Sequence, residues 1–293
     1  LEMSLEQNYI VKFLNMKKIF VVLTLILSLP AVGQKLTKIE PASWWRGMEL
    51  DTVEFMVYGK DISELTAVGK ELMVLSTTAL ESPNYLFVEV VIPDDSRIGT
   101  HKLLFKDEKG RHKRTLDIEV LEREENSANR KGFNSADFIY LITPDRFRNG
   151  DPSNDQVKGM FEGPNRDFIG GRHGGDLAGI IQSLDYFEKM GISSLWLNPV
   201  LENNMETYSY HGYAMTDLYN VDPRYGTNDQ YKELADKAKD RGIGIIMDQV
   251  ANHIGSLHPW ISDLPSEDWV NQWPEFTQTN HMKVSRFDPH CAE

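Results

Sequence analysis

The sequence predicts a multidomain protein of the β plus α/β class, with a β-sandwich followed by a region built on a parallel sheet. Residues 35–122 carry short apolar runs of strand length that turn residues interrupt. From residue 136 onward, strand-like runs alternate with helical patterns, which is typical of parallel βαβ units. Residues 123–135 are charged and poor in apolar side chains, as expected of a linker.

The first region has the pattern of a sandwich. Its clearest strands are Val53–Tyr58 and Leu86–Ile92, and Gly59 and Pro93 follow them directly. Several such strands in succession indicate two packed antiparallel sheets. The pair Trp44-Trp45 has two interpretations, a sugar-stacking platform or ordinary packing, and packing is the commoner role of such a pair.

In the second region, capping residues and glycines mark the ends of the predicted elements. Asp176 is placed to cap a helix over 177–190, and Gly191 and Gly242 are placed to end helices. The run before Met247 has no helical period, which favours a strand buried on both faces of a parallel sheet. The predicted elements, in order, are a strand at 138–142, a helix at 177–190, a strand at 192–197, a helix at 229–241 and a strand at 242–247.

Polar residues follow the last of these strands. Asp248 lies where the strand leaves the core, and Asn252 and His253 lie on the loop beyond. In barrels of alternating strands and helices, such positions build the active site. An isolated match of this kind is also compatible with a capped turn and a structural histidine, because Asp and Asn commonly bond the local backbone.

Four ordered motifs resemble glycoside hydrolase family 13, the α-amylase superfamily. The spacing of Asp248, Val250, Asn252 and His253 resembles that family's first signature region. Two motifs further upstream look like the neopullulanase and cyclomaltodextrinase branch, particularly its periplasmic starch-utilisation members. The motif nearest to Asp248 is Tyr208–Tyr213 with Asp217 and Val221–Thr227. The two motifs that look like the neopullulanase and cyclomaltodextrinase branch are Pro144–Asp155 and Gly170–Asp176.

The resemblance implies that residues 136–255 form the first three βα units of a TIM (β/α)8 barrel and that residues 256–293 begin a protruding subdomain. In the family, the nucleophile and the acid/base come from the ends of the fourth and fifth strands, and a third essential Asp follows the seventh. These strands are not expected in this chain. It therefore looks like an N-terminal fragment, and no catalytic residue is assigned to it.

By the same resemblance, Tyr213 stacks on the sugar next to the scissile bond and His253 donates a hydrogen bond to that sugar. His211 lines the same subsite and Asp248 orients neighbouring groups. The implied function is an exported α-glucan hydrolase that cleaves α-1,4 bonds of maltooligosaccharides or cyclodextrins with retention. The alternatives are a non-catalytic glucan-binding protein with a degenerate barrel and a transglycosidase on the same scaffold.

A calcium site is expected in the loop after the first barrel strand. Asn149, Asp151, Asn154 and Asp155 place four oxygen-bearing side chains in one short stretch, and Ca²⁺ takes six to eight oxygen ligands. The resemblance adds the Gly174 carbonyl and the Asp176 side chain to the ligands of a structural Ca²⁺. The alternative is a tight turn, with Asp176 serving only as a helix cap.

The N-terminal residues have the pattern of an export signal. Basic residues open segment 16–33, an apolar run too short for an easy membrane span follows, and small residues precede Gln34. Residues 1–15 are then upstream sequence, and the mature protein is expected to be periplasmic. The alternative is an N-terminal anchor helix, but a lipid anchor is not expected, since the only cysteine is Cys291.

The formal net charge of −13 is spread along the chain and disfavours nucleic acid or an anionic membrane surface as a partner. In proteins of the resembled family, the N-terminal sandwich often pairs subunits. A homodimer through residues 35–122 is therefore a further expectation.

Overall fold

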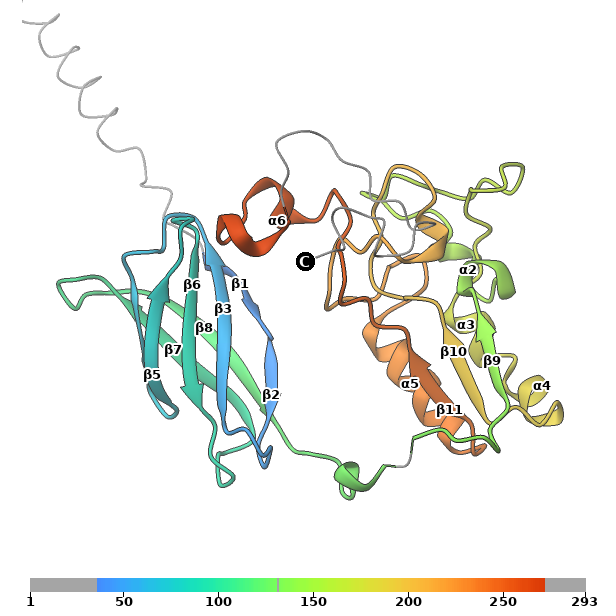
Figure 1. The fold of residues 1–293 in the computed structure, drawn as a ribbon, viewed down its shortest axis with the longest axis horizontal. Coiled ribbons are helices and arrows are strands. Elements are labelled where there is room, and N and C mark those ends of the chain that lie inside the picture. The colour runs from blue at the N-terminus through green and yellow to red at the C-terminus, as the bar shows by residue number, and fades with distance from the viewer. Residues whose placement is uncertain (1–35, 131, 272–293) are drawn as a thin grey trace, which may run out of the picture. The chain divides into compact units, whose positions relative to one another are not determined.

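The structure is a computed structural model that describes residues 36–130 and 132–271. The predicted signal at 16–33, the upstream residues 1–15, Cys291 and most of segment 256–293 lie outside the described residues. The chain divides into two compact units after Arg123. Figure 1 shows the strands β1 to β8 in the first unit and the strands β9 to β11 in the second.

The first unit consists of two four-stranded sheets, with the strand orders β1-β3-β6-β5 and β2-β8-β7-β4. The first sheet is antiparallel throughout, whereas β2 runs parallel to β8 in the second. The predicted β-sandwich is confirmed. Its strands are β1 (Leu36–Glu40), β2 (Ser43–Trp45), β3 (Thr52–Gly59), β4 (Thr66–Gly69), β5 (Met73–Ala79), β6 (Tyr85–Val91), β7 (Gly99–Lys106) and β8 (His112–Leu121).

The sandwich core comes from the inward side chains of alternating strand positions. Phe55 on β3 and Val88 on β6 are fully buried, and they belong to one apolar cluster with Phe105 of the other sheet. Trp44 packs against this cluster, while Trp45 is 41% exposed. The packing interpretation of the tryptophan pair therefore holds for Trp44.

The second unit is built on three parallel strands in the order β11-β10-β9. β9 (Ile139–Ile142) and β11 (Gly244–Met247) both pair in parallel with β10 (Ser194–Leu197). The predicted parallel βαβ arrangement is confirmed. The helices of this unit are α2 (Pro144–Phe147), α3 (Leu177–Ile181), α4 (Leu184–Lys189), α5 (Asn228–Lys239) and α6 (Pro259–Ser262), with 3-10 turns η1 (Ser127–Asn129), η2 (Pro152–Asn154), η3 (Ser209–His211) and η4 (Glu267–Trp269).

The two faces of this sheet differ in burial. The row Tyr140, Leu195 and Ile245 contributes to the apolar core, which also contains Leu234 of α5. Helix α5 lies along this sheet in Figure 1. The opposite face exposes Leu141 and Trp196.

The prediction that the last strand is buried on both faces is wrong for the described part of the chain. Ile245 and Ile246 are half-buried and Met247 is exposed. The reason is that β11 is the edge strand of the sheet and that one of its faces has no covering element among residues 132–271.

The prediction of one helix over 177–190 is also wrong, because two helices, α3 and α4, share this segment. The break falls at Ser183, whose hydroxyl donates to the Gly179 carbonyl (2.8 Å) and lies 3.2 Å from Nη1 of Arg148. A serine that bonds back four residues competes with regular helix geometry. The helix ends are as predicted, since Asp176 accepts from the Gly179 amide at 2.6 Å and Gly191 has a φ of +73°.

Helix α5 begins with a capping box between Thr227 and Gln230 and ends before Gly242, which has a φ of +71°. Within the predicted linker, Glu124 accepts a hydrogen bond from Lys239 of α5 at 2.6 Å. The start of the linker thus packs with the second unit. No helix of the described residues is long and apolar enough to cross a membrane.

Candidate functional site

Four residues predicted for the sugar subsite lie together beyond the carboxyl ends of the parallel strands. We call Trp196, His211, Tyr213, Asp248 and His253 the strand-end cluster. Asp248 directly follows β11, and Trp196 lies near the end of β10. Because parallel strands end at the same edge of a sheet, two distant segments of the chain meet at this point.

Asp248 is the centre of the strand-end cluster. One of its oxygens, Oδ2, accepts from the Tyr213 hydroxyl at 2.8 Å and from the Trp196 indole at 3.2 Å. Burial, together with the hydrogen bond to Asp248 and its negative charge, raises the pKa of Tyr213 to about 12. Tyr213 therefore remains a neutral hydrogen-bond donor, and its ring is oriented by the carboxylate.

Two histidines hold the backbone of Tyr213. His211 Nδ1 accepts from the Tyr213 amide at 2.9 Å, and His253 Nε2 lies 2.9 Å from the Tyr213 carbonyl oxygen. Asn252 Nδ2 lies 3.1 Å from Nδ1 of His253, which suits a tautomer that carries its proton on Nε2. His253 thus donates its Nε2 proton to the Tyr213 carbonyl oxygen. The predicted hydrogen bond from His253 to a sugar stays a prediction.

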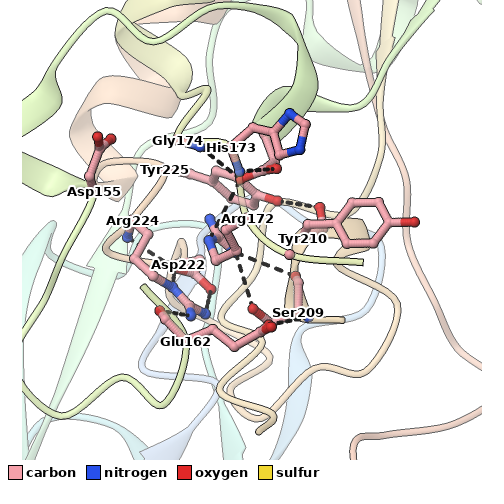
Figure 2. A network of polar contacts seen from close by, with 12 residues as sticks. Asp155, Glu162, Arg172, His173, Gly174, Ser209, Tyr210, Asp222, Arg224 and Tyr225 are labelled. Carbon is pink, nitrogen blue, oxygen red and sulfur yellow. Dashed lines mark hydrogen bonds and ion pairs between the residues drawn. The ribbon is translucent and has the colours of Figure 1, made fainter. Parts of the chain in front are cut away.

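A buried ion network adjoins the turn Ser209–His211, where Arg172 Nη1 donates to the Ser209 carbonyl oxygen at 3.4 Å. We define it as Asp145, Arg172, Asp222 and Arg224, whose side chains are at most 2% exposed. Arg224 donates to both oxygens of Asp222, from Nε at 2.9 Å and from Nη2 at 2.7 Å. Figure 2 shows Arg224 bonded to Asp222 and Arg172 bonded to Ser209.

The network pairs two arginines with two aspartates, and Arg146 outside it also donates to Asp145, from Nε to Oδ2 at 3.0 Å. Arg172 Nε lies 3.7 Å from Asp145 Oδ1. Burial alone would raise the pKa of Asp222, but the hydrogen bonds from Arg224 and the charges of Arg172 and Arg224 keep this pKa below its ordinary value. Asp222 therefore stays ionised opposite Arg224 in the folded protein.

The six residues predicted as calcium ligands form what we call the loop cluster: Asn149, Asp151, Asn154, Asp155, Gly174 and Asp176. Gly174 has a φ of +88°, and a Cβ added there would lie 2.5 Å from Asp155 Oδ1. Asn149 Nδ2 donates to the same Asp155 oxygen at 2.7 Å. The predicted residues are therefore brought together, although they come from two separate motifs.

The other two carboxylates of the loop cluster also bind protein groups. Both oxygens of the fully buried Asp176 accept from backbone amides, Oδ1 from Gly179 and Gly150 and Oδ2 from Asp151. Asp151 Oδ1 accepts from the amide and the hydroxyl of Ser153, and these bonds lower the pKa of Asp151. The alternative roles of turn former and helix cap thus describe part of the cluster.

Two other oxygens of the loop cluster lack a hydrogen-bond partner in the described part of the chain. The buried Oδ1 atoms of Asn149 and Asn154 have no hydrogen-bond partner among the described residues. Buried acceptors without a donor are rare and costly, and a hard cation with oxygen ligands would satisfy them. No group of three or more His, Cys, Asp or Glu side chains suited to a metal occurs in the described ranges. A cation here would depend on amide and carbonyl oxygens around Asp155, and the donor set fits Ca²⁺.

Family models match both units of the chain. A model described as the α-amylase catalytic domain matches residues 140–292, more than half of the 293 residues. The chain belongs to the α-amylase family. A second model, described as the N-terminal domain of cyclomaltodextrinase, matches residues 38–124.

Curated relatives agree with this membership. The chain is 38% identical over 147 residues to a cyclomaltodextrinase of Thermoanaerobacter pseudethanolicus, covering 46% of the chain and 24% of the relative. It is 38% identical over 128 residues to a periplasmic α-amylase of Escherichia coli K12 (40% and 19%) and 39% identical over 121 residues to neopullulanase 2 of Thermoactinomyces vulgaris (40% and 20%). The resemblance to the neopullulanase and cyclomaltodextrinase branch is confirmed, and the matches span at most a quarter of these relatives' length.

Sequence reasoning missed several residues of this α-amylase family site. Trp196 was assigned only to a strand, yet its indole binds the same oxygen as Tyr213. The buried ion network was also missed. A signal for it was present, because Arg172 stands among four glycines, Gly170, Gly171, Gly174 and Gly175, and glycines mark a close approach of chain segments.

We predict that protonation of His211 destabilises the second unit of the chain. Burial lowers the pKa of His211 below 6.5, and the opposing charge of Glu162 does not cancel this effect. Because the unfolded state binds the proton first, stability falls as the pH drops below 6.5. The limit for one proton is about 1.4 kcal/mol per pH unit, and a half-exposed ring contributes less.

Urea unfolding of the wild type and His211→Asn between pH 7 and pH 5 measures this effect. The variant should lose less stability on acidification, whereas His112→Asn, at an exposed histidine of the sandwich, should match the wild type. Equal pH slopes for His211→Asn and the wild type would contradict the prediction.

Proposed function

We propose that the complete protein hydrolyses α-1,4-glycosidic bonds of α-glucans with retention, as a neopullulanase or cyclomaltodextrinase type of enzyme. Its substrates are maltooligosaccharides, cyclodextrins or pullulan. The observation that carries the proposal is the strand-end cluster, in which Asp248 orients an aromatic side chain at the carboxyl ends of parallel strands. Membership in the α-amylase family supports it.

The residues of this chain bind and orient the sugar in this proposal. The Tyr213 ring supplies an apolar face for sugar C–H groups, and Asp248 prevents that ring from rotating away. His211 and His253 fix the Tyr213 backbone and line the same subsite. Rigid placement of substrate contacts lowers the entropic cost of reaching the reactive geometry.

Retaining cleavage also needs two carboxyl groups about 5 to 5.5 Å apart, one as nucleophile and one as acid/base. We assign neither role to a residue of this chain. Asp248 accepts hydrogen bonds from Tyr213 and Trp196 with one oxygen. Asp145 and Asp222 are fully buried in the ion network.

The first test is hydrolysis by the complete protein. It should release maltose or glucose from maltooligosaccharides and cyclodextrin, and oligosaccharides that keep an α-1,6 bond from pullulan. In that protein Tyr213→Ala should lower kcat/KM by about 2–3 kcal/mol in transition-state terms, since the lost ring contacts the sugar at the reacting centre.

Tyr186→Ala is the matched control, because Tyr186 is an exposed tyrosine on α4. It should leave kcat/KM near the wild-type value. Binding of glucan without any turnover would reject the hydrolase and favour a glucan-binding protein, and net transfer of sugar to other sugars would favour a transglycosidase.

We also propose that Ca²⁺ binds the loop cluster. Asn149, Asn154 and Asp155 with the Gly174 carbonyl would hold it, and its role would be to tie two loops together rather than to act on substrate. Asp176 and Asp151 would contribute from the lone pairs that their amide and hydroxyl donors leave open.

Thermal melts in Ca²⁺ and in chelator test this proposal. At a concentration 100 times its Kd, a ligand of the native state adds about 2.7 kcal/mol, so Tm should rise by a few degrees. Asp155→Ala and Asp151→Ala should reduce the rise, while Asp185→Ala, at a surface carboxylate of α4, should keep it. Identical midpoints of the wild type in Ca²⁺ and in chelator would reject the calcium site.

Export and pairing complete the proposal. The pattern of segment 16–33 supports export to the periplasm, and the matched Escherichia coli relative is named a periplasmic α-amylase. Pairing of two subunits through the sandwich stays a prediction.

A further inference from the structure

The segment 208–213 carries two members of the strand-end cluster in a backbone conformation that needs external support. Tyr208 has a φ of +61° and Gly212 a φ of +82°. A left-handed conformation is unfavourable for a residue with a side chain. A Cβ added at Gly212 would lie 2.0 Å from the Pro199 carbonyl oxygen. Such conformations persist when the surrounding structure holds them.

Neighbouring elements hold this segment through its middle residues. Glu162 Oε2 accepts from the Ser209 amide at 2.6 Å, and the Tyr225 hydroxyl donates to the Tyr210 carbonyl oxygen at 2.6 Å. The guanidinium of Arg146 lies 4.0 Å from the centre of the Tyr210 ring. Figure 2 shows Tyr225 and Glu162 reaching the segment from different directions.

Tyr225 is the deepest of these supports. Its side chain is almost fully buried within the core of the second unit, and the Arg172 guanidinium of the buried ion network lies 4.6 Å from its ring centre. Burial also raises the pKa of Tyr225, so its hydroxyl keeps the proton that it donates. The hydrogen bond from this buried side chain therefore holds the Tyr210 carbonyl, which lies directly before His211 and three residues before Tyr213.

We propose that Tyr225 is a positioning residue for the sugar subsite, acting through the Tyr210 carbonyl on His211 and Tyr213. Neither the family motifs nor the strand-end cluster assigns it this role. The inference rests on the proposed α-glucan hydrolase function. Tyr225 does not contact the sugar itself, so its effect is on binding geometry.

Tyr225→Phe in the complete protein isolates the hydroxyl, since the ring and its packing remain. The KM for maltooligosaccharides should rise about fivefold, as expected for one lost buried hydrogen bond, while kcat changes by less than about twofold. The matched control is Tyr231→Phe. Tyr231 is half-buried on α5, and its hydroxyl has no hydrogen-bond partner among the described residues, so its KM should stay at the wild-type value.

A second pair of variants tests the support that Glu162 gives to the same segment. Glu162→Ala removes the acceptor of the Ser209 amide and should also raise KM, whereas Glu162→Gln keeps an acceptor oxygen and should restore most of the wild-type KM. Rescue by glutamine distinguishes positioning from a general loss of stability, which Tm measures separately.

The outcomes separate the two proposals. A complete wild-type protein without activity on α-glucans would overturn the proposed function. An active wild type in which Tyr225→Phe leaves KM unchanged, whatever its Tm, would overturn the positioning role alone.

Discussion

The need to pair buried charges is the constraint on which the second unit depends. Asp222 and Arg224 are two residues apart and both fully buried, and each would be severely destabilising without the other. Their remaining hydrogen bonds go to backbone groups of other loops, from Arg224 to the Glu162 carbonyl and from the Asn203 amide to Asp222. The Asp222–Arg224 ion pair therefore connects three loops, which contain Glu162, Asn203 and the pair itself.

This constraint explains why the loops beyond the strands are rigid enough to form a site. Loop residues supply binding and catalysis when a scaffold positions them. Within the network Arg172 lies beside Asp145, whose carboxylate accepts from the amides of His173 and Gly174. On its other side, Arg172 lies against the ring of Tyr225. The loop cluster and the strand-end cluster thus share one buried support.

Much of the fold was predictable because local patterns carry it. Alternating strands and helices, the Asp176 cap and the Gly191 helix end are set by neighbouring residues and appear as expected. The break at Ser183 was missed because the apolar spacing continues through it, while a side-chain bond to the Gly179 carbonyl interrupts the helix. The burial of β11 was overestimated because the number of strands beside it is not a local property.

The candidate site was predictable only where motifs mark it. Tyr213, Asp248 and His253 were predicted from spacing and resemblance, and the structure brings them together. Trp196 was missed because its partner Asp248 lies 52 residues further along the chain. The ion network was missed for the same reason, since Arg172 and Asp145 are charged residues whose burial depends on distant segments.

A double-mutant cycle on the Asp222–Arg224 pair tests the central claim most directly. Urea unfolding would give the stabilities of the wild type, Asp222→Asn, Arg224→Met and the double variant. Each single variant leaves an unpaired buried group and should lose about 3–5 kcal/mol, while the double variant should lose clearly less than the sum. A coupling free energy of at least about 2 kcal/mol is the predicted result. Additive losses, or single variants as stable as the wild type, would contradict the claim that this pair organises the loops.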